Sequence, residues 1–136
     1  MSLISDKLFY DALKEDEAII QATDGRIYNT VYPEENTEAE RIPYIIIFHE
    51  GVTNSAESKD CGPEGTRDVE TIRLFIVADE RKDLAELSTM VRKCIKDASD
   101  DWYMYDYQFS AGPVAFDYDK PCHYQSFTYV CETPNE

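Results

Sequence analysis

The sequence predicts an α+β fold, in which a largely antiparallel sheet of four or five strands carries helices packed on one face. Apolar side chains alternate along residues 69–78, which is the pattern of a strand with a buried face. Residues 84–98 then place apolar side chains at the spacing of an amphipathic helix. Residues 102–132 form short β-rich segments separated by turns. We expect the whole chain, residues 1–136, to form one domain, because its length suits a single core.

The first third of the chain is expected to hold two helices and a short strand. Residues 3–14 repeat apolar side chains at spacings near four, which indicates a helix. Asp16 is the expected N-cap of a second, short helix, and Asp24-Gly25 is expected to end it. Residues 26–32 alternate in the manner of a short strand.

Two loops surround the next expected strand. Residues 34–41 are rich in glutamate and are expected to form a solvated loop. Residues 44–50 are apolar on both faces, which indicates a central strand. Residues 51–66 combine glycines with small polar side chains and are expected to form a long loop, and a loop of about sixteen residues is usually functional or mobile. The strand at 69–78 and a helix ending near residue 97 follow.

The last third is aromatic as well as β-rich. Strands are expected at residues 102–109, 114–119 and 124–132. In the first of them, Tyr103, Tyr105 and Tyr107 share one face. Such a stripe could stack nucleic-acid bases, but no basic residues accompany it, so packing or a protein interface is the better interpretation.

The charge of the chain restricts its partners. The 136 residues include 28 acidic and 13 basic side chains, for a formal net charge of -15. Both halves of the chain are acidic, so each would repel a phosphate backbone. This excludes sequence-general nucleic-acid binding and disfavours anionic membranes. Acidity can also imitate nucleic acid towards a basic partner, or keep nucleic acid from adhering to a surface.

No pattern of catalytic residues is found. His49 lies beside Glu50 on an expected strand, and a structural or surface role is favoured over that of a catalytic base. Asp100-Asp101, Asp117 and Asp119 are interpreted as solvated turns and strand edges, because acids are abundant throughout the chain. We therefore predict no catalytic, cofactor-binding or metal-binding residues.

The cysteines are expected to be free thiols. They are Cys61, Cys94, Cys122 and Cys131, and no two form a C-x-x-C pair. The start of the chain lacks the basic and apolar segments of a secretory signal, which also argues against disulfides. A zinc site built from Cys122-His123, Cys131 and His49 is disfavoured, because structural zinc sites usually have short paired spacings.

The order of elements over residues 3–98 resembles a known family. A helix precedes Gly25-Arg26-Ile27-Tyr28 and an acidic loop, and Ile42-Pro43-Tyr44-Ile45-Ile46-Ile47 begins the next strand. A glycine-containing loop, the strand at 67–78 and the helix at 84–95 follow. This arrangement resembles the small tail-completion, or tail-terminator, proteins of tailed bacteriophages and prophages. Residues 99–136 are more tyrosine-rich than the family leads one to expect, and we interpret them as a β-rich extension of the same sheet.

The resemblance implies a structural role without catalysis, cofactors or metals. It implies a homo-oligomeric ring, usually hexameric, that caps the tail tube and joins it to a head-side neck or connector protein. The partners would be other copies of the chain, the tail-tube protein and the neck protein. DNA would only pass through the lumen, and no membrane is involved. The protein would be made in the host cytoplasm and located in the tail or neck of the virion.

Two groups of residues are candidates for that role. One subunit's loop is expected to lie on its neighbour in the ring, and the candidate interface residues are Thr53, Asn54, Ser55, Glu57, Lys59 and Asp60. The alternative is that this loop is only a solvated connection. A lumen that passes DNA should repel phosphates, and the candidate lumen residues are Glu34, Glu35, Glu38 and Glu40.

Other functions stay open at this point. Another neck connector or adaptor of the same machinery would have a similar fold and charge. From a different class, an acidic inhibitor or immunity-type protein could block a basic partner, and it would be monomeric. A small enzyme is disfavoured, because neither a nucleophile–base pair nor metal-ligand spacing is found.

Overall fold

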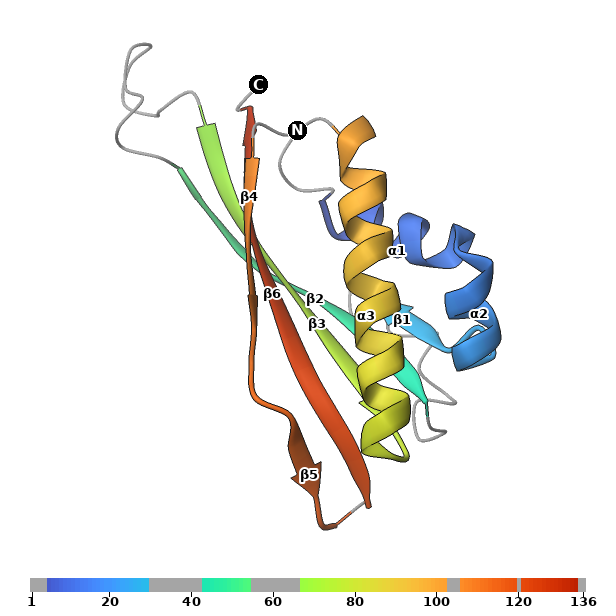
Figure 1. Ribbon diagram of the computed structural model, residues 1–136. Coiled ribbons are helices and arrows are strands. Elements are labelled where there is room, and N and C mark those ends of the chain that lie inside the picture. The colour runs from blue at the N-terminus through green and yellow to red at the C-terminus, as the bar shows by residue number, and fades with distance from the viewer. Residues whose placement is uncertain (1–4, 30–42, 55–66, 103–105, 120, 135–136) are drawn as a thin grey trace.

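The structure is a computed structural model, and it describes residues 5–29, 43–54, 67–102, 106–119 and 121–134 (Figure 1). Its helices are α1 (Ser5–Glu15), α2 (Glu17–Thr23), α3 (Arg81–Ala98) and the short 3-10 helix η4 (Ser99–Asp101). Its strands are β1 (Ile27–Asn29), β2 (Tyr44–Asn54), β3 (Arg67–Ala78), β4 (Asp106–Ala111), β5 (Ala115–Asp117) and β6 (Cys122–Pro134).

The strands form one mixed but mostly antiparallel sheet. Its order is β1-β2-β3-β6-β4, and β5 also pairs with β6. Only β1 and β2 run parallel, and every other pair is antiparallel. The α+β prediction is thus confirmed, whereas the strand number differs. The sheet has six strands rather than four or five, because all six expected strand segments join it, and the 13-residue β6 is long enough to hold β4 and β5 in line along one side.

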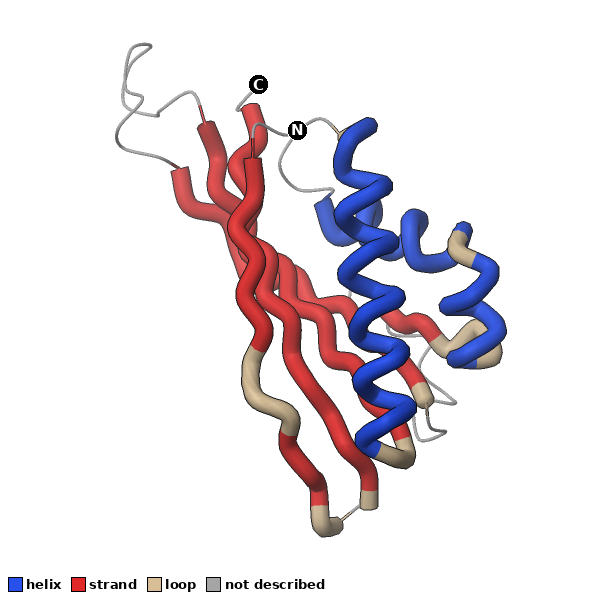
Figure 2. Tube along the Cα trace, in the orientation of Figure 1, coloured by secondary structure: helices blue, strands red, loops and turns tan. Residues whose placement is uncertain are grey.

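The helices cover one face of the sheet, as predicted (Figures 1 and 2). The alternation along β3 buries Ile72, Leu74 and Ile76 completely beneath them. The apolar stripe of α3 packs on that layer, so the strand period and the helix period meet in one core. The opposite face of the sheet carries no helix in the described part of the chain.

Both predicted ends of α2 are confirmed. The carboxylate of Asp16 accepts hydrogen bonds from the backbone N–H groups of Ala18, at 3.0 Å, and Ile19, at 3.2 Å. Asp24 has a φ of 55°, in the left-handed region that ends a helix, and Gly25 follows with a φ of 76°. The strand expected at 26–32 is present as β1, and residues 30–32 lie outside the described residues.

Aromatic rings hold α1 on the sheet. Phe9 is fully buried, and its ring centroid lies 4.8 Å from that of Trp102 and 5.0 Å from that of Tyr129. Tyr129 also contacts the ring of Tyr107 at 5.5 Å. The tyrosines near the end of the chain therefore include core residues, which supports the packing interpretation for Tyr107. Tyr103 and Tyr105 lie outside the described residues.

The predicted loop at 51–66 is wrong at its start. β2 continues to Asn54, with an irregularity in its pairing to β3 between His49 and Gly51. Gly51 has a φ of 141°, a backbone conformation that suits glycine. The glycine interrupts the apolar alternation, so the sequence indicates a strand end. The backbone hydrogen bonds to β3 nevertheless continue beyond it, and β3 begins correspondingly early, at Arg67.

Candidate interaction surfaces

The structure places two of the six candidate interface residues. Thr53 and Asn54 lie at the end of β2, paired with Val69 and Asp68 of β3, and Thr53 is exposed. They lie at the end of the sheet where β3 also pairs with β6, and β6 with β4. The other four candidates, Ser55, Glu57, Lys59 and Asp60, lie outside the described residues.

The four candidate lumen residues belong to a different connection of the chain. Glu34, Glu35, Glu38 and Glu40 all lie outside the described residues. Their segment connects β1 to β2, so its two ends are held on the β1 side of the sheet. The candidate interface and the candidate lumen segment therefore start from different places in the fold.

His49 and Glu70 form a buried pair across β2 and β3. The Nε2 atom of His49 lies 2.9 Å from Oε1 of Glu70, a distance typical of a strong hydrogen bond. The Glu70 side chain is 0% exposed and that of His49 is 16% exposed. The irregularity in β2 follows His49 directly and falls at the exposed Glu50. This geometry supports the structural role predicted for His49, because the pair is enclosed rather than open to a substrate.

The structure separates the residues of the conceivable zinc site. His123 and Cys131 lie eight positions apart on the same strand, so roughly 26 Å of extended chain separates them. Within the described ranges, no group of three or more His, Cys, Asp or Glu side chains is arranged to hold a metal ion. Cys94, Cys122 and Cys131 are buried free thiols.

These thiols should react slowly in the folded protein. Burial, followed by the nearby Asp16 carboxylate, raises the pKa of Cys94 to about 12, and its thiol donates to the carbonyl oxygen of Ala12 at 3.3 Å. Burial, and then Glu70, raises the pKa of Cys131 to about 12. A raised pKa leaves little reactive thiolate at pH 8.

In a Cys61→Ser variant, we therefore expect a thiol-specific reagent at pH 8 to label almost nothing until denaturant is added. It should then label the three described cysteines. Stoichiometric labelling of the folded variant within minutes would contradict their burial.

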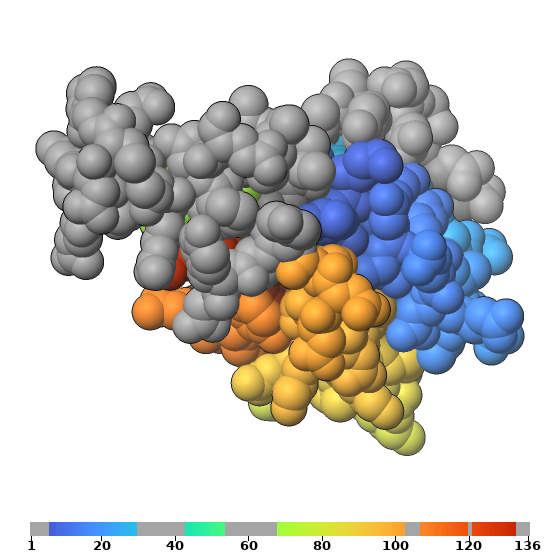
Figure 3. All heavy atoms as spheres, turned by 90° about the horizontal axis from the view of Figure 1, so that it is seen from above, coloured from blue at the N-terminus to red at the C-terminus, as the bar shows by residue number. Residues whose placement is uncertain are grey.

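A groove with a basic lining lies between α3 and β4. Its volume is about 710 Å³, and it is lined by Thr89, Arg92, Lys93, Lys96, Tyr107, Phe109 and Tyr129. Among the described side chains, those that line it include no acidic group, although the whole chain has a net charge of -15. Figure 3 shows the end of α3 and β4 side by side at the surface. The sequence signal for this groove is three cations within five positions of one helix, a pattern that equally suits the C-terminal end of a helix dipole.

Two groups in the groove are held in specific ways. The guanidinium carbon of Arg92 lies 4.3 Å from the centroid of the Phe109 ring, which fixes the cation over an aromatic face. The hydroxyl of Tyr129 is buried and has no hydrogen-bond partner in the described part of the chain. Burial raises the pKa of Tyr129 well above its ordinary value, so the hydroxyl stays protonated and can donate a hydrogen bond.

The helix-free face of the sheet carries an apolar patch. A shallow hollow of about 270 Å³ is lined by Tyr44, Ile46, Phe48, Phe75, Val77, Asp117, Cys122 and Tyr124. The rings of Phe48 and Phe75 meet edge to face, with their centroids 5.3 Å apart. The alternation of β2 thus buries Ile45 and Ile47 under the helices and leaves its other apolar face partly exposed. None of the helices that the structure describes has the length and apolarity needed to cross a membrane.

Comparisons with known proteins find a similar fold but no related family or curated sequence. No family profile matches the chain, and no curated protein matches it in sequence. A chain in the virion of a native gene transfer agent (GTA) particle superposes with a TM-score of 0.70 and 13% sequence identity, over 99% of this chain and 100% of that chain. A crystal structure from Akkermansia muciniphila gives a TM-score of 0.36 at 10% identity, over 96% and 79% of the two chains, which is too distant to support an argument. At 13% identity, the first likeness shows a shared fold.

Proposed function

We propose that this chain is a non-enzymatic structural protein of a phage-like virion, which forms a ring that caps the tail tube and joins it to the neck. The observation that carries the proposal is the end-to-end match in fold to a chain of the GTA virion. The match covers residues 99–136 as well, where the family resemblance was weakest, and it is compatible with one domain over residues 1–136. The partners would be other copies of the chain, the tail-tube protein and a head-side neck protein.

The acidic surface suits a passage for DNA. A ring through which a genome moves should not bind it, and carboxylates on the lumen repel phosphates over about 8–10 Å in physiological salt. We assign this task to Glu34, Glu35, Glu38 and Glu40, and keep the end of β2 for contact between subunits.

Reversing the lumen charge should slow DNA ejection without preventing assembly. Particles that carry Glu35→Lys and Glu38→Lys should assemble in normal number, because the two residues are not assigned to an interface. Their lumen should hold the phosphate backbone and delay its exit, as measured by dye-detected ejection in vitro. Asp100→Lys with Asp101→Lys, in the 3-10 helix η4 and outside the assigned lumen segment, is the matched control. Unchanged ejection in the first variant would contradict the lumen assignment.

Shortening the β2–β3 connection should prevent ring formation and leave a folded monomer. Replacing residues 55–67 with Asn-Gly joins Asn54 to Asp68, its partner in β3, by a two-residue turn and so keeps the strand register. Circular dichroism should show the native fold, while size-exclusion chromatography should show loss of the ring. An intact ring would show that this connection is not part of the interface and would favour a solvated loop.

The main alternative within the same machinery is a neck connector or adaptor. An alternative from a different functional class is an acidic inhibitor, which would bind a basic partner as a monomer. The net charge of -15 is the observation in favour of the inhibitor. Negative-stain images of the pure protein, alone and with tail tubes, distinguish these possibilities. Rings or capped tubes support the proposal, whereas a protein that remains monomeric and never binds a tube favours the inhibitor.

A further inference from the structure

We infer that β4 and the basic groove beside it form the receptor for the end of β2 from a second copy of this chain. The inference rests on the proposed ring and specifies which surfaces join its subunits. The occupant of the groove would be the exposed edge of β2 together with the acidic segment that follows it. The contact is heterologous, because one side of each copy meets the opposite side of the next.

Within the described part of the chain, two edges of the sheet are open to pairing with another chain. β4 ends the sheet on one side, and its outer edge has no partner among the described strands. On the other side, β1 covers only Ile45–Ile47 of β2, so the following residues up to Asn54 pair with β3 alone within the described ranges. Open edges of this kind expose backbone donors and acceptors and readily accept a further strand.

The end of β2 and the start of β4 lie at the same height along the strand direction, which is called their level here. Thr53 of β2 is in register with Val69 of β3, which pairs with Glu132 of β6, and Glu132 pairs with Asp106 at the start of β4. Rotation about an axis that runs along the strands does not change this level. A ring built by such rotations therefore brings the end of β2 beside β4 of the neighbouring copy.

The strand directions also fit. The pairs β2–β3, β3–β6 and β6–β4 are all antiparallel, so β2 and β4 run in opposite directions. A neighbouring copy with the same orientation would place its β2 antiparallel to β4. The antiparallel alternation would then continue from one subunit to the next without a break.

The charges of the two surfaces are complementary. Arg92, Lys93 and Lys96 line the groove, and all three are exposed. The segment after β2 contains Glu57, Asp60 and Glu64 against the single cation Lys59. The unpartnered hydroxyl of Tyr129, which lines the same groove, supplies a donor for a carboxylate or carbonyl oxygen of the arriving segment.

Cysteine cross-linking tests the pairing of the edges. In a Cys61→Ser background, Thr53→Cys and Asp106→Cys each place one thiol on an edge strand, at two positions that the register puts at the same level of the sheet. A mixture of the two variants should give oxidised dimers, whereas neither variant alone should. A chain that carries both substitutions should give a ladder of oligomers, because within one chain the two positions are about three strand spacings, or roughly 14 Å, apart.

The outcomes separate this inference from the proposed function. Rings seen by electron microscopy without cross-linking in the mixture would overturn the edge pairing and leave the ring intact. Dimers of the Thr53→Cys variant alone would show an isologous contact and would also overturn it. Absence of any self-association, and of any binding to tail tubes, would contradict the proposed function itself.

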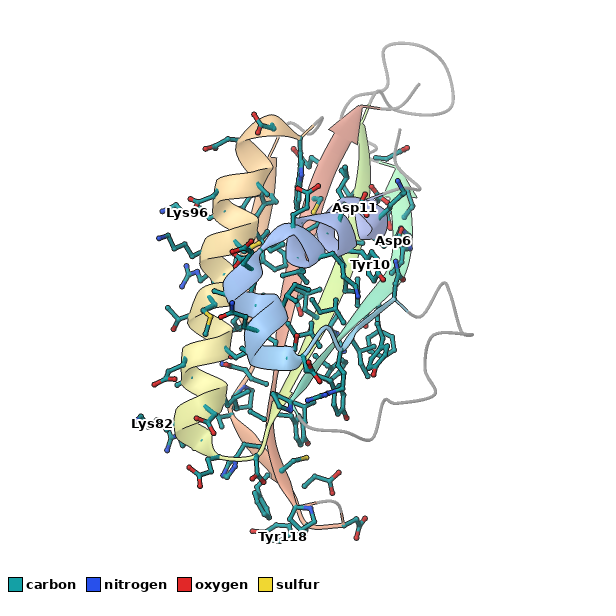
Figure 4. The ribbon with its side chains drawn as sticks, turned by 90° about the vertical axis from the view of Figure 1, so that its right-hand side faces the viewer. Asp6, Tyr10, Asp11, Lys82, Lys96 and Tyr118 are labelled. Carbon is teal, nitrogen blue, oxygen red and sulfur yellow. The ribbon has the colours of Figure 1, made fainter. Side chains whose placement is uncertain are left out.

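Charge reversal on α3 tests the groove. Lys93→Glu with Lys96→Glu should weaken self-association by about tenfold or more, because two attractions become repulsions. Arg81→Glu with Lys82→Glu is the matched control, since these exposed cations lie at the other end of the same helix (Figure 4). Adding Glu57→Lys and Asp60→Lys to the first variant should restore association. Equal weakening by the two pairs, or none by the first, would contradict the groove assignment, with circular dichroism confirming that each variant is folded.

Discussion

Phe9→Ala should destabilise the protein by about 3–5 kcal/mol, which is the usual cost of removing a buried phenylalanine side chain. Phe9 is fully buried and contacts both Trp102 and Tyr129, so its removal leaves a cavity between α1 and the sheet. The rigid β6 below and the long α3 beside it limit how far the cavity can collapse. Urea unfolding followed by circular dichroism measures the loss directly.

Tyr118→Ala is the matched control for this prediction. Tyr118 is also aromatic, but it is 85% exposed, beyond the end of β5. We expect its substitution to change the free energy of unfolding by no more than about 0.5 kcal/mol. A loss below about 1 kcal/mol for Phe9→Ala would contradict the packing of α1 on the sheet.

His49→Ala should destabilise the protein by about 3 kcal/mol, because it removes a partner from the fully buried carboxylate of Glu70. The two side chains join β2 to β3 next to the irregularity in β2. The end of β2 should also become more mobile, so hydrogen exchange at residues 51–54 should accelerate. Urea unfolding and exchange mass spectrometry measure the two effects.

A neighbouring ion pair provides the control for His49. The Nε atom of Arg73 lies 3.2 Å from Oε1 of Glu50, and the two side chains are 38% and 35% exposed, respectively. Glu50→Ala should therefore cost no more than about 1 kcal/mol. Replacing His49 and Glu70 together by leucine should recover part of the stability lost in His49→Ala, because no buried charge then remains. Equal losses for Glu50→Ala and His49→Ala would contradict the buried pair.

The sequence predicted the elements in which local pattern and tertiary packing agree. The alternation of β3, the helical stripe of α3 and the caps of α2 all follow from residues close in the chain. The end of β2 did not follow, because Gly51 breaks the pattern while pairing with the distant β3 continues. β4 and β5 lie one after the other along the same side of β6. This arrangement depends on the length of β6, so the local sequence around β4 and β5 does not predict it.

The candidate surfaces were less predictable than the fold. A basic groove is formed when Arg92, Lys93 and Lys96 of α3 meet the aromatic side chains of β4 and β6. The helix pattern alone shows only the cations, and their partners lie 11 to 37 positions further along the chain. Likewise, the partnership of His49 with Glu70 requires the strand register across the irregularity in β2.

The most direct test of ring formation is an image of the assembled protein. Electron microscopy of the purified chain, mixed with tail tubes of the same virion, should show closed rings or tubes ending in one ring. Their subunits should be joined edge to edge through β2 and β4. Subunits that remain single, with bare tube ends at every concentration, would contradict a ring-forming structural protein.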